Sequence, residues 1–315
     1  MELLLPVLLF ALGLVLIIKG GDIFVDAASW MARVSGIPPF IVGATVVSLA
    51  TTLPEIMVSA LAAVSGQVDM ANGNAIGSVA ANTGLILAIA MMAMPAAVRR
   101  RDYLLKSLVL IACLSVLLIF SQGGALRRSG SLILFALFLL AMADSIRSGR
   151  QAMADTEDGR PDPVKKDILK NLVLFLAGAA FIVAGAKLLV DNGSLLARML
   201  GVPEGIIAVT LVAVGTSLPE LVTTITAIAK KQSSLSAGNV IGANIIDCAL
   251  ILPICGLISG QELPVGAQCL GLDLPFCLAI VCTALLPMLL RQRFMRWQGW
   301  ACLGLYVVYM GFVIL

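Results

Sequence analysis

The sequence predicts an all-α membrane protein of ten transmembrane helices, arranged as two inverted five-helix repeats. Three observations lead to this fold class. Of the 315 residues, 60% are hydrophobic and only 12% are charged, whereas about 25% of a soluble domain is charged. The apolar residues gather in ten long stretches, and a bilayer span needs roughly 20 such residues. The chain also matches itself without a gap at an offset of 165 residues.

The apolar stretches are expected to be helices, because a backbone in lipid must satisfy its own hydrogen bonds. A barrel would instead show segments of about ten residues with alternating polarity. The stretches lie near residues 2–18, 39–62, 75–97, 104–120, 131–146, 168–190, 205–229, 240–258, 272–290 and 298–315. The start of the chain lacks a basic region and a cleavage pattern, so we interpret it as part of the first span and not as a removed signal peptide.

Lysines and arginines predict the orientation, since they favour cytoplasmic loops. With the N-terminus outside, 16 of the 21 basic residues fall inside, 3 fall outside and 2 lie within spans. We therefore expect an integral protein of the plasma (inner) membrane with both termini outside. The polar segment 148–167 reads as a cytoplasmic linker between a first five-helix repeat, 1–147, and a second, 168–315. The net charge of +3 then reflects topology and lipid contacts, not nucleic-acid binding.

The self-match indicates a duplication. Residues 11–90 and their counterparts share 27 identities in 80, and these include Leu-Pro-Glu at 53–55 and 218–220. Matches of Pro, Glu, Gly, Asn and Asp are informative because such residues are uncommon in lipid. Five spans per half is an odd number, so the second half must enter the membrane from the opposite side. Inverted repeats of this kind place substrate sites near the midplane, at the interface of the repeats.

Two glutamates carry the chemistry of the predicted site. Glu55 and Glu220 each follow a proline in the middle of an apolar stretch, where an unpaired carboxylate costs at least a few kcal/mol. Proline removes a backbone donor and displaces the carbonyl four residues earlier. Those carbonyls belong to Ala50 and Gly215. Carboxylates, hydroxyls and free carbonyls form an all-oxygen site of the kind that suits hard cations such as Ca²⁺ and Na⁺.

Helical spacing groups further polar residues around these glutamates. Positions i, i+3, i+4 and i+7 share one helical face, which sets Ser48, Thr51 and Thr52 beside Glu55, and Ala213, Thr216 and Ser217 beside Glu220. A second pair of stretches carries Asn74, Ser78 and Asn82, matched by Asn239, Ala243 and Asp247. Glycines in these stretches permit close helix approach. Single hydroxyls in membrane helices often bond only to their own backbone, so the symmetric glutamates carry the argument.

Composition also narrows the function class. The chain has no histidine, which removes His-based metal sites, Ser–His dyads and His proton relays. Its seven cysteines form no C-x-x-C pair, so we interpret them as small buried hydrophobes. Asp26 and Asp191 repeat as well, and lie near Lys19 and Lys187; for these we expect structural pairing or placement at the membrane interface. We predict neither an enzyme nor a bound cofactor, with Ca²⁺ and Na⁺ as transported ions.

These motifs resemble the alpha-repeats of the Ca²⁺/cation antiporter superfamily, and in particular its Na⁺/Ca²⁺ exchanger branch, over essentially the whole chain. The family pattern is G-T-S-L-P-E followed by G-N-x-x-G-S-N in each half. The second half here reads G-T-S-L-P-E and G-N-V-I-G-A-N, and the first reads A-T-T-L-P-E and G-N-A-I-G-S-V. The departures are Ala50, Val79 and Ala243.

The resemblance implies ten helices and a role for each matched residue. Glu55 and Glu220 would bind Ca²⁺ directly, assisted by Thr51 and Thr216. Asn82 and Asp247 would line the centre. Flanking Na⁺ sites would draw on Ser48, Thr52, Ser78, Ala213 and Ser217. Ala243 removes one hydroxyl from this set, which leaves the Na⁺ stoichiometry open, and Asp247 leaves K⁺ use open.

Three alternatives to Na⁺/Ca²⁺ exchange remain at this point. A Ca²⁺/H⁺ antiporter of the same superfamily would titrate the glutamates in place of binding Na⁺. A cation channel usually forms from symmetric subunits around a pore, whereas both halves here lie in one chain. A membrane-embedded aspartyl protease could use Asp22 or Asp26, but no second catalytic motif accompanies them. The expected partners are therefore Ca²⁺ and Na⁺, with K⁺ and H⁺ open, together with membrane lipid, and no nucleic acid. The oligomeric state is left open.

Overall fold

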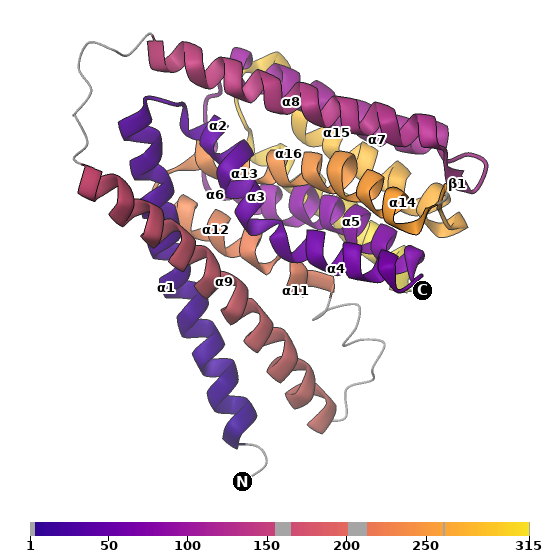
Figure 1. Cartoon of the computed structure of the whole chain (residues 1–315), viewed down its shortest axis with the longest axis horizontal. Helices are drawn as coiled ribbons and strands as arrows, with labels where there is room; N and C mark the ends of the chain where they lie inside the picture. Colours follow the sequence, from indigo (N-terminus) through magenta and orange to yellow (C-terminus); the bar gives the residue numbers. More distant parts are fainter. Residues whose placement is uncertain (1–3, 155–164, 201–212, 261, 315) are drawn as a thin grey trace.

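The computed structural model describes residues 4–154, 165–200, 213–260 and 262–314, which form a bundle of helices (Figure 1). The helices of the first half are α1 (Leu4–Ser35), α2 (Pro39–Val42), η1 (Gly43–Val47), α3 (Ser48–Thr51), α4 (Leu53–Val64), α5 (Val68–Ala81), η2 (Asn82–Leu87), α6 (Ala88–Ala93), α7 (Arg100–Phe120) and α8 (Arg128–Ala154). Those of the second half are α9 (Lys165–Met199), α11 (Ala213–Thr216), α12 (Leu218–Ala229), α13 (Ser233–Ile246), η4 (Asp247–Ile251), α14 (Leu252–Ser259), η5 (Cys269–Asp273), α15 (Leu274–Arg291) and α16 (Arg296–Ile314). Elements labelled η are π-helical turns. Strands β1 (Ala125–Leu126) and β2 (Leu263–Pro264) pair antiparallel.

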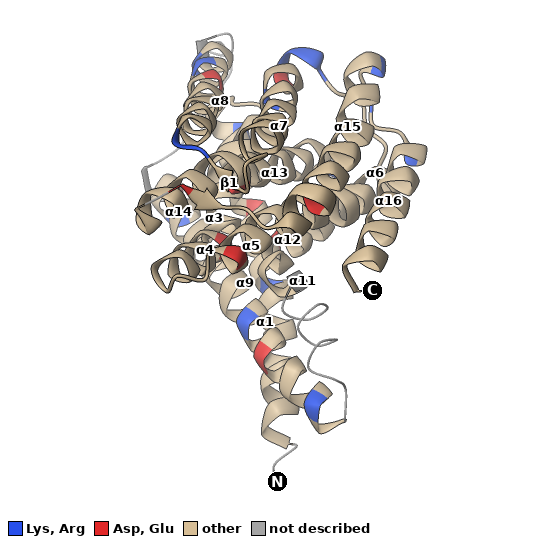
Figure 2. Cartoon of the chain, turned by 90° about the vertical axis from the view of Figure 1, so that its right-hand side faces the viewer, with Lys and Arg blue, Asp and Glu red and all other residues tan. Residues whose placement is uncertain are grey.

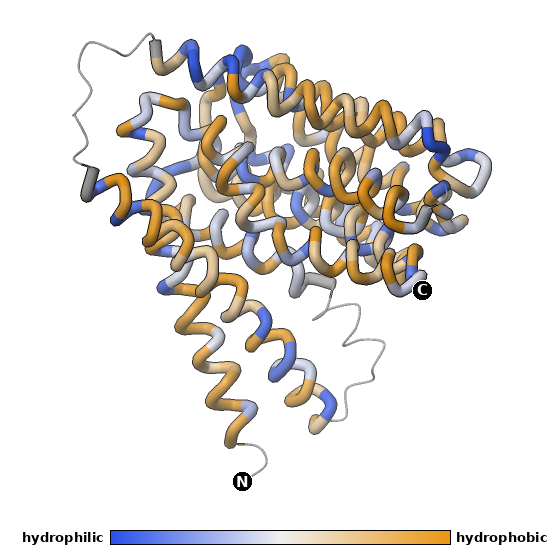
Figure 3. The backbone as a smooth tube through the Cα atoms, viewed as in Figure 1, coloured by the Kyte–Doolittle hydropathy of each residue, from blue (hydrophilic) through white to orange (hydrophobic). Residues whose placement is uncertain are grey.

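The prediction of an all-helical membrane protein is confirmed. In the described part of the chain, eight helices are long and apolar enough to cross a bilayer, and nine if the bent pair Pro39–Thr51 and Leu53–Val64 is one span. The tenth expected span, 205–229, falls partly on residues 201–212, which lie outside the described residues. Its described portion includes the shorter apolar helix α12. Figure 3 shows hydrophobic residues along the outer helices, as a surface in lipid requires.

The predicted bounds of the first span are wrong. The stretch 2–18 is only the start of α1, which continues as one helix of 32 residues to Ser35. Two of the polar residues that follow this stretch pair with Lys230, the residue just after α12: its Nζ lies 2.7 Å from Asp26 Oδ1 and 3.5 Å from Asp22 Oδ1. Asp26 therefore does form an ion pair, but its partner is Lys230 and not the neighbouring Lys19.

Helices α1 and α9 pack against each other in opposite directions and extend away from the remaining helices (Figure 1). Glycines allow the close contact. A methyl group added to Gly13 would lie 2.9 Å from the carbonyl oxygen of Gly185, and one added to Gly20 would lie 3.0 Å from that of Gly178. Gly13 and Gly20 are the repeat counterparts of Gly178 and Gly185, so equivalent residues of the two halves form both sides of this contact.

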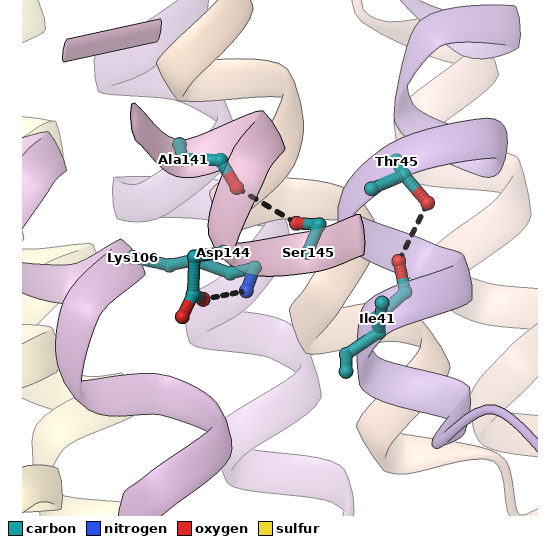
Figure 4. Close-up of polar contacts among 6 residues, drawn as sticks. All are labelled: Ile41, Thr45, Lys106, Ala141, Asp144 and Ser145. Carbon is teal, nitrogen blue, oxygen red and sulfur yellow. Dashed lines mark hydrogen bonds and ion pairs between the residues drawn. The ribbon is translucent and has the colours of Figure 1, made fainter. Parts of the chain in front are cut away.

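The seven cysteines are unpaired, and six of them are buried, in accordance with their interpretation as small hydrophobes. The main hydrophobic core lies between α5, α7, α13 and α15. It contains one buried cation. Lys106 of α7 is 1% exposed and its Nζ lies 2.8 Å from Oδ2 of Asp144 on α8 (Figure 4). The same Nζ lies 5.7 Å from the ring centre of Phe40, at the start of the helix that leads to Glu55.

We expect Asp144→Leu to lower the free energy of unfolding by about 3 kcal/mol, because it leaves a buried ammonium without its partner. The double variant Lys106→Met, Asp144→Leu should regain most of this loss, since replacing both charges by apolar groups is often neutral. The measurement is the unfolding midpoint in detergent. The pair of Arg99 and Asp102, at 2.9 Å with the Arg99 side chain 73% exposed, provides the control, because Asp102→Asn should cost less than about 1 kcal/mol. Equal losses in the single and double variants would contradict the assignment.

Candidate cation-binding site

The site is organised by a helix break that occurs once in each half. In the first half α3 ends at Thr51, Thr52 stands between the helices, and α4 begins at Leu53 with a bend of 47°. In the second half Ser217 separates α11 from α12 in the same way. A proline follows in the first turn of each new helix, where its missing N–H has no partner to lose. The predicted continuous helical face from Ser48 to Glu55 is therefore interrupted.

The break places each glutamate in the first turn of a helix, where the helix dipole favours negative charge. Glu55 is 1% exposed and Glu220 is fully buried. Each glutamate is held by a hydroxyl from the other half. Thr52 donates to Oε1 of Glu220 at 3.0 Å, and Ser217 donates to Oε1 of Glu55 at 3.5 Å. Thr52 and Ser217 are repeat counterparts, so the two hydrogen bonds are equivalent and cross in opposite directions.

The remaining acidic oxygens of the site are buried without a partner among the described residues. These atoms are Oε2 of Glu55, Oε2 of Glu220 and both carboxylate oxygens of Asp247, and the amide oxygen of Asn82 shares this condition. Burying a carboxylate oxygen unpaired costs several kcal/mol. A cation bound among these oxygens would remove that cost. Figure 2 shows acidic positions inside the helical body as well as at its ends.

Asn82 and Asp247 occupy equivalent positions at the start of π-helical turns, η2 and η4. A π-helical turn inserts an extra residue into the helix and often marks a functional site. Both side chains are buried, at 1% and 0% exposure. The sequence predicts these two residues at the centre of the site, and the structure buries each of them with an unpaired side-chain oxygen among the described residues.

The predicted hydroxyl residues differ in what their side chains contact. Ser78 lies 3.5 Å from Ser217, oxygen to oxygen, and so belongs to the Glu55 side of the site. Thr51 donates to the amide oxygen of Asn239 at 3.1 Å, and Ser48 donates to the carbonyl of Thr45 at 3.1 Å. The hydroxyls of Thr51 and Ser48 are thus committed to protein acceptors. Thr216 is half-buried in α11. Ala213 begins α11, but its side chain lies outside the described residues.

Several contacts of the site were not among the predicted ligands. Asn74 donates to Oγ of Ser59 at 2.9 Å and to the backbone carbonyl of Glu55 at 3.3 Å, which ties α5 to α4. Asn244 donates to Oγ1 of Thr83 at 2.7 Å across the halves. Asn74 and Asn244 both lie in the G-N-x-x-G-S-N motif segments, and this motif is the sequence signal that could have indicated them. Their hydrogen-bond partners could not be identified in this way, because they are distant in sequence.

The helices of the site approach closely at glycines. A methyl group on Gly238 of α13 would collide with the carbonyl oxygen of Phe40, and one on Gly242 would lie 2.6 Å from Oγ of Ser48. On the opposing element, a methyl group on Gly43 would collide with the carbonyl oxygen of Leu235. The crossing of α2 and η1 with α13 therefore depends on these glycines, as the prediction of close helix approach required.

The donor set is suited to hard cations. Carboxylate, hydroxyl and amide oxygens are the ligands of Ca²⁺ and Na⁺, whereas soft metals prefer sulfur and imidazole. No group of three acidic, cysteine or histidine side chains among the described residues converges closely enough to hold a metal ion on its own. Cation binding here therefore calls on hydroxyl, amide and backbone oxygens in addition to the carboxylates.

Comparison with known proteins identifies similar sequences over the whole chain. A family model described as "Sodium/calcium exchanger protein" matches residues 5–146 and 170–315. The chain is 36% identical to the inner membrane protein YrbG of Escherichia coli over 82% of each chain. It is 29% identical to the sodium/calcium exchanger MaX1 of Methanosarcina acetivorans over 96% of this chain and 97% of that protein.

A solved structure shows the same fold. The sodium-calcium exchanger NCX_Mj, in crystals soaked with Na⁺ and Sr²⁺, superimposes with a TM-score of 0.85 at 28% sequence identity. The match covers 98% of this chain and 99% of that one. The two matched segments of the family model leave residues 147–169 between them, close to the predicted linker.

Proposed function

The chain belongs to the sodium/calcium exchanger protein family, and from this membership we propose that it is an antiporter that exchanges Na⁺ for Ca²⁺ at Glu55 and Glu220. One observation carries the assignment to these residues. Each glutamate is buried, each is held through one oxygen by a hydroxyl of the other half, and each keeps its second oxygen unpaired. Two carboxylates neutralise one Ca²⁺, or share several Na⁺. The two ions compete for the same oxygens, which couples their movement.

The inner ligands follow from the same geometry. Asp247 and Asn82 add unpaired oxygens, and Ser78 and Ser217 lie within 3.5 Å of each other on the Glu55 side. We assign Thr52 and Ser217 to positions between the carboxylates and flanking Na⁺ ions. Thr51 acts through Asn239, which it contacts at 3.1 Å. Asp247 contributes an additional negative charge that K⁺ could also use, and the experiment below includes K⁺ for that reason.

We further propose ten spans in two inverted repeats that alternate access to the site. The antiparallel packing of the equivalent helices α1 and α9 (Figure 1) supports inversion, because equivalent helices of parallel repeats would run the same way. These two helices contact the remaining bundle mainly through α12 and the bent span that follows α1, so they are suited to move as a unit against it. The distribution of basic residues supports an orientation with both termini outside and the linker in the cytoplasm.

A flux assay tests the proposal. The protein is reconstituted in Na⁺-loaded liposomes, and radioactive Ca²⁺ uptake is followed after dilution into Na⁺-free buffer, with external K⁺ and a pH gradient varied separately. We expect uptake that requires internal Na⁺. Uptake that is driven by a proton gradient and is indifferent to Na⁺ would assign Ca²⁺/H⁺ exchange instead. Uncoupled Ca²⁺ flux would indicate a channel.

A further inference from the structure

The contact between α1 and α12 is present in only one of its two repeat-related forms. A methyl group added to Gly21 of α1 would lie 2.8 Å from Oγ1 of Thr226 and 2.9 Å from Cγ1 of Val222 on α12, so these two helices pack closely. The repeat counterparts of Thr226 and Val222 are Leu61 and Met57 of α4. Leu61 and Met57 are 62% and 61% exposed, so α9 does not cover α4 in the equivalent way.

This difference indicates which side of the cation site is closed. Helix α12 runs from Glu220 in its first turn to Ala229, next to Lys230, at the end that the basic residues assign to the cytoplasm. Helix α4 runs from Glu55 to Val64, and in an inverted repeat it leads to the opposite face. The packing of α1 on α12 therefore closes the cytoplasmic side, while the uncovered α4 leaves the outer side open.

An ion pair strengthens the contact on the cytoplasmic side. Nζ of Lys230 lies 2.7 Å from Oδ1 of Asp26 and 3.5 Å from Oδ1 of Asp22, and it donates to the backbone carbonyl of Asp22 at 3.1 Å. The Lys230 side chain is 25% exposed, and those of Asp22 and Asp26 are 50% and 69% exposed. Partial exposure makes the contribution of the pair modest and sensitive to salt.

The repeat does not reproduce this ion pair at the outer side. The counterpart of Lys230 is Ser65, the residue that follows α4. The two aspartates of α1 are matched by Lys187 and Asp191, which lie four residues apart on α9 and are exposed. When α9 packs on α4, these charges therefore meet a serine, which offers them no ion pair.

We propose that Lys230 is a latch that favours the conformation whose cytoplasmic side is closed. Its ion pair must break when α1 leaves α12, and Ser65 offers no replacement when α9 reaches α4. An interaction made in only one of two conformations shifts the population toward that conformation. The latch thereby lowers the fraction of molecules whose site opens to the cytoplasm, and it raises the apparent Kd for Ca²⁺ on that side. This inference rests on the proposed function, because it assumes that access alternates.

The test measures the two conformations without transport. Thr226→Cys and Leu61→Cys are made separately, and each is labelled with a water-soluble thiol reagent in detergent, with the parent protein as background. The α1–α12 contact covers position 226 in the closed conformation, and the α9–α4 contact would cover position 61 in the other. We expect Lys230→Gln to speed the labelling of Thr226→Cys at least about threefold at low salt. It should slow the labelling of Leu61→Cys, and high salt should reduce both effects.

Two matched variants isolate the ion pair. Lys231→Gln removes a neighbouring charge that is exposed and forms no ion pair in the described part of the chain, and it should stay within about 1.5-fold of wild type. Lys230→Arg keeps the charge and should label like wild type. Equal effects of Lys230→Gln and Lys231→Gln would overturn the latch, because the general charge of this end would then be responsible.

The reciprocal change separates a latch from local loosening. Faster labelling at position 226 with unchanged labelling at position 61 would overturn the proposal, because α12 would then have frayed without a change of conformation. In oriented vesicles, Lys230→Gln should also lower the cytoplasmic Ca²⁺ concentration for half-maximal exchange at least about twofold. If the wild type does not exchange ions, the proposed function fails, whereas the labelling still decides whether Lys230 holds α1 on α12.

Discussion

Glu55→Gln and Glu220→Gln should each reduce Na⁺-dependent Ca²⁺ uptake at least about 100-fold in reconstituted liposomes. Each substitution replaces a buried carboxylate by an isosteric amide and removes one negative charge from the site. Interactions with a charged group, such as hydrogen bonds, contribute about 1.5–3 kcal/mol each, and a loss of about 2.8 kcal/mol corresponds to a factor of 100. The amide NH₂ also points a donor where the cation needs an acceptor.

The variants should nevertheless be well folded. Without bound cation, each substitution removes a buried carboxylate with an unpaired oxygen, so the unfolding midpoint in cation-free detergent should be no lower than that of wild type. Glu262→Gln is the matched control, because Glu262 is exposed and is not one of the candidate site residues. Its uptake should equal that of wild type. Substantial uptake by either site variant would remove that glutamate from the ligand set.

The sequence indicates the two glutamates through a signal that is both chemical and symmetric. A carboxylate in the middle of an apolar stretch is costly, and the repeat shows Glu55 and Glu220 at equivalent positions. The same symmetry predicts Asn82 and Asp247 as partners. What the sequence predicts less well is geometry that depends on the opposing half. The hydroxyl that reaches Glu220 is that of Thr52, whereas Thr51 in the next position contacts Asn239.

The interruption of the helices explains this difference. The predicted face assumed a continuous helix from Ser48 to Glu55, with 100° between residues. The break at Thr52 and the π-helical turn η1 before Ser48 change that angle, so Ser48 contacts its own backbone. Proline predicts that the helix breaks. The angle of that break depends on the crossing with α13 at Gly238 and Gly242, which are far away in sequence.

Span ends were predicted least accurately, for an electrostatic reason. The sequence places Asp26 near the end of a span, yet α1 continues beyond Asp22 and Asp26 to Ser35. Their charges are compensated by Lys230, which is more than 200 positions away in the chain. Hydropathy along the chain contains no information about such a partner. A prediction based on hydropathy therefore ends a span at the first charged residues.

Locking α1 to α12 should stop exchange if the α1–α9 pair moves against the rest of the bundle. A Cβ atom built on Gly21 lies 3.7 Å from Cβ of Thr226, close to the separation of about 3.8 Å in disulfides. Gly21→Cys with Thr226→Cys should therefore form a bridge on oxidation. We expect Na⁺-dependent Ca²⁺ uptake by the oxidised protein to fall at least about tenfold and to recover after reduction. Six of the native cysteines are buried, so oxidation should act mainly on the introduced pair.

A matched bridge within one body separates locking from the effect of oxidation itself. A Cβ atom on Gly256 of α14 lies 3.8 Å from Cβ of Leu263 in β2, and neither residue belongs to α1 or α9. Gly256→Cys with Leu263→Cys should retain uptake when oxidised. The α1–α12 bridge should also leave Ca²⁺ binding to the detergent-solubilised protein intact, because it touches none of the site residues. Full uptake by quantitatively bridged protein would refute movement of α1 against α12. Loss of both uptake and binding would indicate damage to the site, so binding without transport is the result that identifies α1 as a moving element.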